Sequence, residues 1–248
     1  MARRVWSVVC VSALIAFTLA ACDDFFSTSW GEARKYDLSK IKLTSGNLQE
    51  WKNKAVGNPE LAGKLVEKII RELDGKSGAE KAAFQDAGVD LAVEQSGIGT
   101  TILDIAGKDM DKLVSGGDED AIKGLLGTVQ GKFGAKGYAA AENIAAIAVG
   151  SVSGSSFAAD DLYAAQVSAA DVGMAVAVLA LSIMPDINSK GFGKNSLDDS
   201  GVSLSGDTFS GSGSKAATFA AYMNLIMKDN TGKFTGNPIT SGLKSAFE

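Results

Sequence analysis

Apolar residues recur at helical spacing along much of the chain, most clearly between residues 57 and 75. One set recurs every four residues with two apolar neighbours beside it: Leu61, Leu65, Ile69, Leu73, Val66 and Ile70. This spacing gives a helix one apolar face. Just before it, Gly57-Asn58-Pro59-Glu60 supplies a stop, a cap, a proline for the first helical position and an acid for the first turn. We therefore predict a helix that follows this cap and ends near Gly75.

The same signals predict further helices on both sides of this one. They cover part of 39–55 and then 79–95, 109–115, 118–133 and 214–228. In the first of these, Asn47 is the expected cap, with Glu50 in the capping-box position. The inward residues of 79–95 are Phe84, Ala87 and Leu91, and the spacing continues after a glycine break at Ile98, Ile102 and Ile105. The last helix is expected to bury Phe219, Tyr222, Met223 and Ile226.

Residues 118–137 contain two patterns, each with two interpretations. Asp118-Glu119-Asp120 introduces a helix, where acids complement the helix dipole, and metal ligation is the competing interpretation. Glycines recur every three or four residues, at positions 124, 127, 131, 134 and 137. They either let two helices approach closely or weaken the helix, since each costs about 1 kcal/mol relative to alanine. We expect close packing within a bundle.

Residues 160–184 are the most apolar stretch beyond the N-terminal region. From Val172 to Met184 there are 13 residues without a charge, too few to cross a bilayer core of about 30 Å as a helix. A central buried helix that ends before Pro185 is the expected structure, and a membrane-inserting segment is the alternative.

Residues 186–214 are dominated by glycine, serine and aspartate, which indicates a long mobile loop or a small hairpin. Two motif searches fail in this segment. Asp186-x-Asn188-x-Lys190-Gly191 begins like a calcium loop, but Lys190 stands at a ligand position and Leu197 replaces the closing glutamate. Gly193-Lys194-Asn195 resembles the end of a phosphate-binding loop, but no Ser or Thr follows the lysine. We therefore expect no cofactor and no metal.

Near the C-terminus one earlier pattern recurs. Gly236-Asn237-Pro238-x-x-x-Gly242 matches Gly57-Asn58-Pro59-x-x-x-Gly63. An ancestral repeat is one explanation, but the flanking segments do not align at a fixed period. A single way of starting a helix, used twice, is the simpler interpretation.

Together these patterns predict an all-α fold: a helical bundle or an irregular array of short helices with a long Gly/Ser-rich loop. The helical domain is expected to span 39–248, with the mobile loop at 186–214. A chain of this size can bury a substantial core.

Histidine and cysteine counts exclude much catalytic chemistry. The 248 residues contain no histidine, which excludes Ser-His-Asp and Cys-His catalysis as well as histidine-ligated zinc and haem. Only two cysteines are present, Cys10 and Cys22. Carboxylate, lysine or tyrosine chemistry remains, but no pair of carboxylates stands at a recognisable spacing. We therefore expect no catalytic residues and no enzyme.

The N-terminus has the organisation of an export signal. Arg3 and Arg4 precede an apolar run from Val5 to Ala21 that ends in small residues, which favours cleavage over a permanent span. Leu19-Ala20-Ala21-Cys22 then matches the lipobox of bacterial lipoproteins, which implies a signal peptide over 1–21 and acylation of Cys22. Cleavage would take away both arginines and no acid, so the formal charge would move from −5 to about −7.

A tether over 22–38 would follow the acylated cysteine. Phe25, Phe26 and Trp30 are candidates for the membrane interface, where aromatic rings are favoured, or they cover an edge of the domain. Asp23 and Asp24 stay in water beside them. An acidic chain without a basic face is a poor candidate for binding nucleic acid.

The lipobox, FFSTSWG at 25–31 and ARKYDLSKIKLTSGNLQEW at 33–51 together resemble the start of exported lipoproteins of treponemes and related spirochaetes, many of unassigned function. The likeness covers about the first fifth of the chain. It implies export and modification by acyl chains such as palmitate, and it supplies no catalytic residues.

We therefore expect a cell-envelope lipoprotein that is held to a membrane through Cys22 and faces the periplasm or the outer surface. Its expected role is that of a non-enzymatic partner-binding or scaffolding module for an envelope protein. The alternative is a binding protein or carrier for a small apolar ligand or lipid, held between helices such as 79–106 and 158–184. A third hypothesis, a carboxylate-dependent hydrolase of cell-wall glycans, requires two acids that converge in a cleft.

Overall fold

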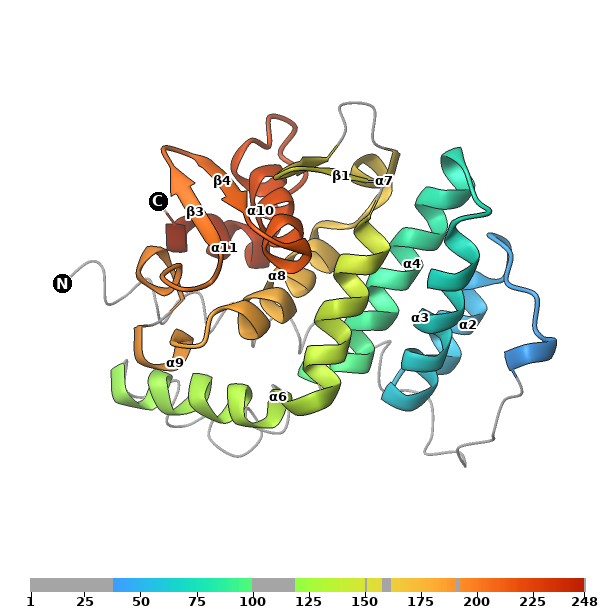
Figure 1. Cartoon of the computed structure of the whole chain (residues 1–248), viewed down its shortest axis with the longest axis horizontal. Coiled ribbons are helices and arrows are strands. Elements are labelled where there is room, and N and C mark those ends of the chain that lie inside the picture. The colour runs from blue at the N-terminus through green and yellow to red at the C-terminus, as the bar shows by residue number, and fades with distance from the viewer. Residues whose placement is uncertain (1–37, 100–118, 150, 158–161, 191, 248) are drawn as a thin grey trace.

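The fold is mostly helical, with two small two-stranded sheets, so the broad all-α prediction is confirmed (Figure 1). The computed structural model describes residues 38–99, 119–149, 151–157, 162–190 and 192–247. The predicted signal peptide, the tether up to residue 37, Ile102, Ile105 and the predicted helix at 109–115 lie outside these residues.

The N-terminal part packs three helices together: α2 (Leu48–Ala55), α3 (Pro59–Leu73) and α4 (Gly78–Ser96), after a short 3-10 turn η1 (Leu38–Lys40). The predicted cap of α3 is confirmed, because the Asn58 side chain accepts the Leu61 N–H at 3.0 Å and Pro59 occupies the first position. The predicted apolar faces are buried as well: Leu61, Leu65, Ile69 and Leu73 on α3, and Phe84, Ala87 and Leu91 on α4.

The predicted cap of α2 is wrong. The Asn47 side chain makes no bond to the first turn of the helix. It accepts the Thr44 N–H at 2.8 Å and donates to the Lys42 carbonyl at 3.0 Å. Asn47 therefore closes the turn that leads into α2, and its side chain is engaged by the backbone of that turn instead of by the helix.

The helix predicted over 118–133 is longer in the structure than predicted, where it forms α6 (Glu119–Ala148). Gly134, with φ 46° and ψ −163°, breaks it into two arms that point in different directions (Figure 1). The expected close helix packing is wrong at Gly131 and Gly134, where an added Cβ would meet nothing within 4 Å. Gly137 does lie close to another group, the ring of Phe133 in the same helix.

The apolar stretch 160–184 forms two helices, α7 (Leu162–Gln166) and α8 (Ala169–Ile183). Ser168 separates them and caps α8, where its hydroxyl accepts the Asp171 N–H at 3.0 Å. The central position of α8 is confirmed, since it packs against α4, α6, α10 and α11. None of the helices in the described ranges is long and apolar enough to span a bilayer.

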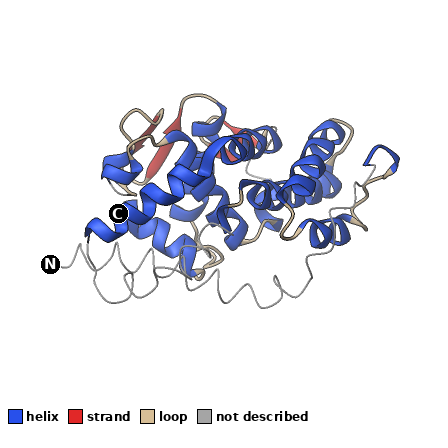
Figure 2. Ribbon diagram, turned by 90° about the horizontal axis from the view of Figure 1, so that it is seen from below, coloured by secondary structure: helices blue, strands red, loops and turns tan. Residues whose placement is uncertain are grey.

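The C-terminal part contains the remaining elements. They are α9 (Ile187–Lys190), the 3-10 turn η2 (Lys194–Ser196), β3 (Val202–Ser205), β4 (Thr208–Gly211), α10 (Ser214–Met227) and α11 (Pro238–Phe247). The other hairpin pairs β1 (Val152–Ser153) with β2 (Ser156–Phe157). Both hairpins lie on one side of the helices and contact α10 (Figure 2). The expected long loop over 186–214 is therefore wrong, and the structure has the alternative, a hairpin preceded by short helical turns.

The recurring Gly-Asn-Pro pattern starts a helix in both places. Asn237 accepts the Ile239 N–H at 2.9 Å, just as Asn58 accepts from α3. In the last part of the chain, α10 buries Phe219, Tyr222, Met223 and Ile226 as predicted. The Tyr222 hydroxyl lies 2.5 Å from that of Tyr163 and joins α10 to α7 inside the core.

Candidate binding edge of the β3–β4 hairpin

The site residues predicted from the sequence lie outside the described part of the chain. These are Cys22 for acylation and Phe25, Phe26 and Trp30 for the membrane interface. They stay predictions. Among the described residues, no group of three or more acidic or cysteine side chains is arranged to hold a metal ion.

The hairpin forms because its turn suits a tight two-residue connection. Gly206 has φ 57°, while Asp207 keeps a negative φ, the combination found in type II′ turns. Antiparallel pairing then places Ser205 opposite Thr208 and Leu204 opposite Phe209. The turn chemistry and the alternation of apolar Val202 and Leu204 with Ser203 and Ser205 both favour this register.

The outer edge of β4 is covered by α10. The Phe209 N–H donates to the Asn224 side chain at 2.9 Å, and the Asn224 amide donates back to the Phe209 carbonyl at 2.9 Å. The same amide also reaches the Ser155 carbonyl at 2.6 Å. One buried asparagine thus takes the place of a neighbouring strand and joins both hairpins to α10.

Glycine lets β4 approach α10 this closely. A Cβ built on Gly211 would lie 2.1 Å from the Ala216 carbonyl oxygen and 2.5 Å from the Ala217 nitrogen. Both atoms belong to the helix backbone, so no side-chain rotation would make room. Gly211 is therefore a requirement of this packing.

Among the described residues, no strand pairs with the outer edge of β3, which we call the open edge. In an antiparallel ladder the two residues of a pair exchange both hydrogen bonds or neither. Because both backbone groups of Phe209 bond to Asn224, the opposite residue, Leu204, directs its N–H and C=O away from β4. No hydrogen-bond partner is recorded for the Leu204 backbone in the described structure, whereas the Val202 N–H donates to Ser200 Oγ at 3.0 Å.

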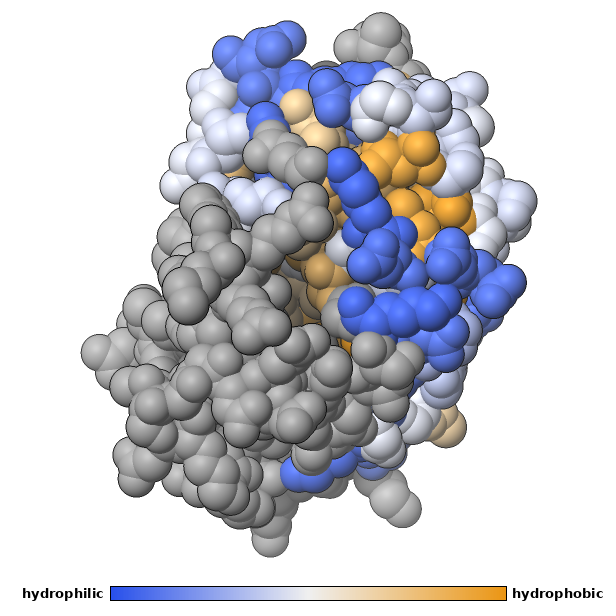
Figure 3. Space-filling model, turned by 90° about the vertical axis from the view of Figure 1, so that its left-hand side faces the viewer, coloured by the Kyte–Doolittle hydropathy of each residue, from blue (hydrophilic) through white to orange (hydrophobic). Residues whose placement is uncertain are grey.

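A surface hollow of about 740 Å³ lies beside this open edge. It is lined by Lys194, Leu197, Asp198, Asp199, Gly201, Val202, Ser203, Leu204 and Gly206. Its volume falls within the usual range of about 300–1,000 Å³ for small-molecule sites. Figure 3 shows the face that lies at the left of Figure 1, where apolar surface is exposed between bands of hydrophilic residues. Leu204 is one of the partly buried apolar residues that pack on the core.

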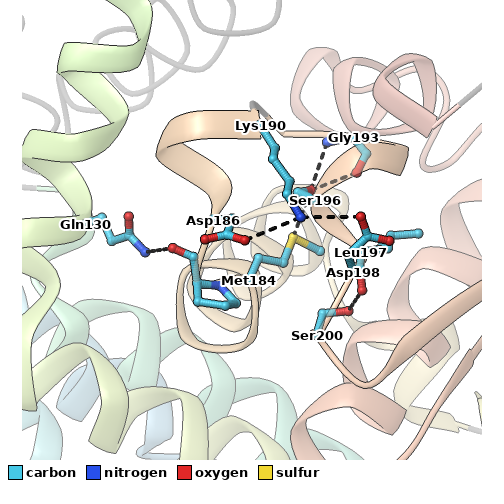
Figure 4. A network of polar contacts seen from close by, with 10 residues as sticks. Gln130, Met184, Asp186, Lys190, Gly193, Ser196, Leu197, Asp198 and Ser200 are labelled. Carbon is cyan, nitrogen blue, oxygen red and sulfur yellow. Dashed lines mark hydrogen bonds and ion pairs between the residues drawn. The ribbon is translucent and has the colours of Figure 1, made fainter.

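Polar contacts fix the segment that forms the opposite wall of the hollow (Figure 4). Lys190 Nζ lies between Asp186 and Asp198, 3.3 Å from a carboxylate oxygen of each. The hydrogen bond to Asp198 holds the pKa of Lys190 above its usual value. The buried Ser196 hydroxyl donates to the Gly193 carbonyl at 2.7 Å and closes the η2 turn. The wall is thus built from short-range bonds within residues 186–200.

Asp199 stands out within this wall. Its φ of 62° places it in the left-handed region, which aspartate and asparagine tolerate better than other non-glycine residues. It is exposed, and no partner for its carboxylate is recorded in the described structure. The hollow therefore presents one unpaired negative charge next to the open strand.

A second cluster of charged groups lies on α4, away from the hollow. Asp86, Asp90 and Glu94 are four residues apart and share one helical face. Lys52 of α2 forms an ion pair with Asp90 at 2.6 Å. Burial raises the pKa of Asp86, whose Oδ1 is buried without a hydrogen-bond partner.

Two carboxyl groups have strongly raised pKa values: Glu94 of this cluster, and Asp171 in the first turn of α8, which feels the charge of Asp90. Burial raises the pKa of Glu94 to about 7, even though the Gly57 N–H donates to it at 2.9 Å. Burial, with the charge of Asp90 nearby, raises the pKa of Asp171 to about 6. None of these acids lines the hollow. The raised pKa values of Glu94 and Asp171 make the stability of the fold depend on pH. From the sequence alone, only the four-residue spacing of the acids on α4 could be seen.

The apolar pocket considered between 79–106 and 158–184 stays a prediction, since only part of these two segments is described. The inward side chains of α8, such as Val172, Val176 and Leu179, are fully buried in the core. The hollow lies instead against β3 and has a charged rim. Comparison with protein-family models, curated proteins and solved structures finds no match for the chain.

Proposed function

We propose that the chain is a lipoprotein of the bacterial cell envelope, acylated on Cys22, whose helical domain is a non-enzymatic module that binds a protein partner. The anchor rests on the lipobox Leu19-Ala20-Ala21-Cys22, which directly follows a charged and then apolar N-terminal segment. A lipid anchor of two or more chains would hold the domain at a membrane without help from its surface.

The observation that carries partner binding is the open edge of β3 beside the hollow. Sheet edges with unpaired backbone groups are sites at which other chains bind. The corresponding edge of β4 is closed by Asn224, so the open edge is a local feature and does not follow from the presence of a hairpin.

The anchor is tested by metabolic labelling with an alkyne-bearing palmitate in bacteria that express the full chain. We expect label on the wild type and none on Cys22→Ala. Cys10→Ala is the matched control, since it removes the other cysteine of the chain and should keep the label. Equal labelling of both variants would disprove acylation at Cys22.

Partner binding is tested by placing a photo-crosslinking amino acid at Ser203, which lines the hollow, and at Lys64, an exposed residue of α3. In cells that contain the native envelope, a defined crosslinked protein is expected at Ser203 and not at Lys64. If neither these positions nor others around the domain give a crosslinked protein, the partner-binding function is wrong.

A further inference from the structure

We propose that the open edge of β3 binds an extended segment of the partner as a third strand, with a basic side chain of that segment opposite Asp199. The inference rests on the proposed partner-binding function and specifies its surface and the kind of segment that fits. Strand addition uses backbone hydrogen bonds for affinity and alternate side chains for specificity.

The backbone groups needed for strand addition are in place. Leu204 directs its backbone N–H and C=O away from β4, because the opposite residue, Phe209, uses both of its backbone groups to bond Asn224. Alternation along the ladder gives Val202 the same orientation, so its carbonyl is a second acceptor. The Val202 N–H is held by Ser200 Oγ, which marks where the open edge begins.

The lining of the hollow favours an extended chain with alternating side chains. Leu197 and Val202 are buried at 8% and 7% exposure and provide an apolar floor beside β3. Side chains alternate between the two faces of a strand, so every second residue of an added segment would lie over this floor. Apolar residues suit those positions.

The charge of the hollow favours a basic segment. Its lining contains two aspartates and one lysine. Asp198 is already paired with Lys190, whereas Asp199 has no recorded partner, so Asp199 is the group left to bind an incoming cation. A lysine or arginine of the partner would complete this pair.

The probe is an acetylated and amidated octapeptide of alternating lysine and valine, added to the full chain in detergent micelles. We expect binding with a dissociation constant below about 1 mM, measured by fluorescence anisotropy, and slower hydrogen exchange of the Leu204 amide in the complex. A glutamate–valine peptide of equal length is the charge control and should not bind.

Backbone pairing is tested with two further peptides, one N-methylated at the valine nitrogens and the other at the lysine nitrogens. Alternate residues of a strand donate from opposite edges. One analogue should therefore lose affinity by at least about tenfold while the other keeps it. Equal affinity of the two analogues would rule out strand addition.

The ion pair is tested with Asp199→Asn, because asparagine keeps the left-handed backbone while removing the charge. The affinity for the lysine–valine peptide should fall about two- to fivefold, as for exposed ion pairs. Asp207→Asn is the matched control, since it removes the same charge from the turn of the same hairpin and does not line the hollow. Equal effects of the two variants would disprove the role of Asp199.

These outcomes are separate from the test of the proposed function. A partner that crosslinks elsewhere on the domain, together with a peptide that does not bind below about 1 mM, would refute strand addition and leave partner binding intact. Peptide protection of an amide other than Leu204 would likewise refute the assignment to β3.

Discussion

The helices α2 to α4 and the segment from Phe192 to Gly213 are stabilised in different ways. The helices bury regular apolar faces, and their surfaces carry ion pairs one helical turn apart, such as Lys64 with Glu60. The C-terminal segment instead depends on glycines at close contacts and on side chains that bond to backbone groups, above all Asn224. Helical faces tolerate substitution where side chains can repack, but backbone contacts do not, so single changes should differ most between these regions.

The largest effect is expected for Gly211→Ala. The added Cβ would lie 2.1 Å from a backbone oxygen of α10, so helix and strand would have to separate. We expect a loss of at least about 3 kcal/mol in the free energy of unfolding, measured by urea denaturation. Gly131→Ala in α6 is the control, because nothing lies within 4 Å of its Cβ, and a gain of about 0.5–1 kcal/mol is expected there. Equal effects would disprove the close contact.

Asn224→Ala should give the next largest loss. It removes the hydrogen bonds to both backbone groups of Phe209, which then lie buried and unpaired. A loss of about 2–4 kcal/mol is expected in urea denaturation. Asn53→Ala, which removes only an exposed bond to Gln49, should change stability by less than about 0.5 kcal/mol. A small effect at Asn224 would mean that the β4 edge is not held by this side chain.

This difference also explains which parts of the fold could be predicted. The start of α3 follows from Asn58 and Pro59, because a cap and its helix are adjacent in sequence. The hairpin edge depends on the bond between Phe209 and Asn224, which are 15 residues apart, and no local pattern indicates that pairing. Asn47 shows the opposite error. Its position in the sequence suits a helix cap, but in the structure its side chain bonds to the backbone of the turn before α2.

The candidate site could not be predicted from sequence patterns for a similar reason: it depends on contacts between residues that are not adjacent in the sequence. Glycine and serine in 186–214 fit a loop or a hairpin equally well, and only the register shows that the Leu204 backbone faces outwards. The spacing of the acids on α4 is visible in the sequence. The pKa values of Asp86 and Glu94 are raised because residues from other helices bury these two acids, and that proximity comes from the fold.

The buried acids lead to a pH-dependent stability of the helical region. Glu94 has a pKa of about 7 in the folded state, above the value of 4.5 for an exposed glutamate, so between these values the folded state binds more protons than the unfolded state. Stability is therefore highest at low pH within this window and falls as the pH rises towards 7. Asp171, whose pKa is raised from 3.8 to about 6, likewise lowers the stability of the folded state as the pH rises between these two values.

We expect the free energy of unfolding to fall by about 2 kcal/mol between pH 5 and pH 8, measured by urea denaturation. The chain has no histidine, the usual titrating side chain in this range. Glu94→Gln should flatten the dependence, whereas Glu60→Gln, at an exposed ion pair outside the cluster, should leave it unchanged. A wild type that is more stable at pH 8 than at pH 5 would contradict the assignment.

The smallest of these effects is expected at the cap of α3. Asn58→Ala removes the acceptor for the Leu61 N–H, and the freed amide lies near the helix end where water can replace the lost partner. The loss should be about 1 kcal/mol, and Asn58→Ser should recover most of it because serine caps nearly as well. If Asn58→Ala instead cost as much as Gly211→Ala, the helical region would depend on single backbone contacts as strongly as the hairpin does, and the contrast between the two regions would be wrong.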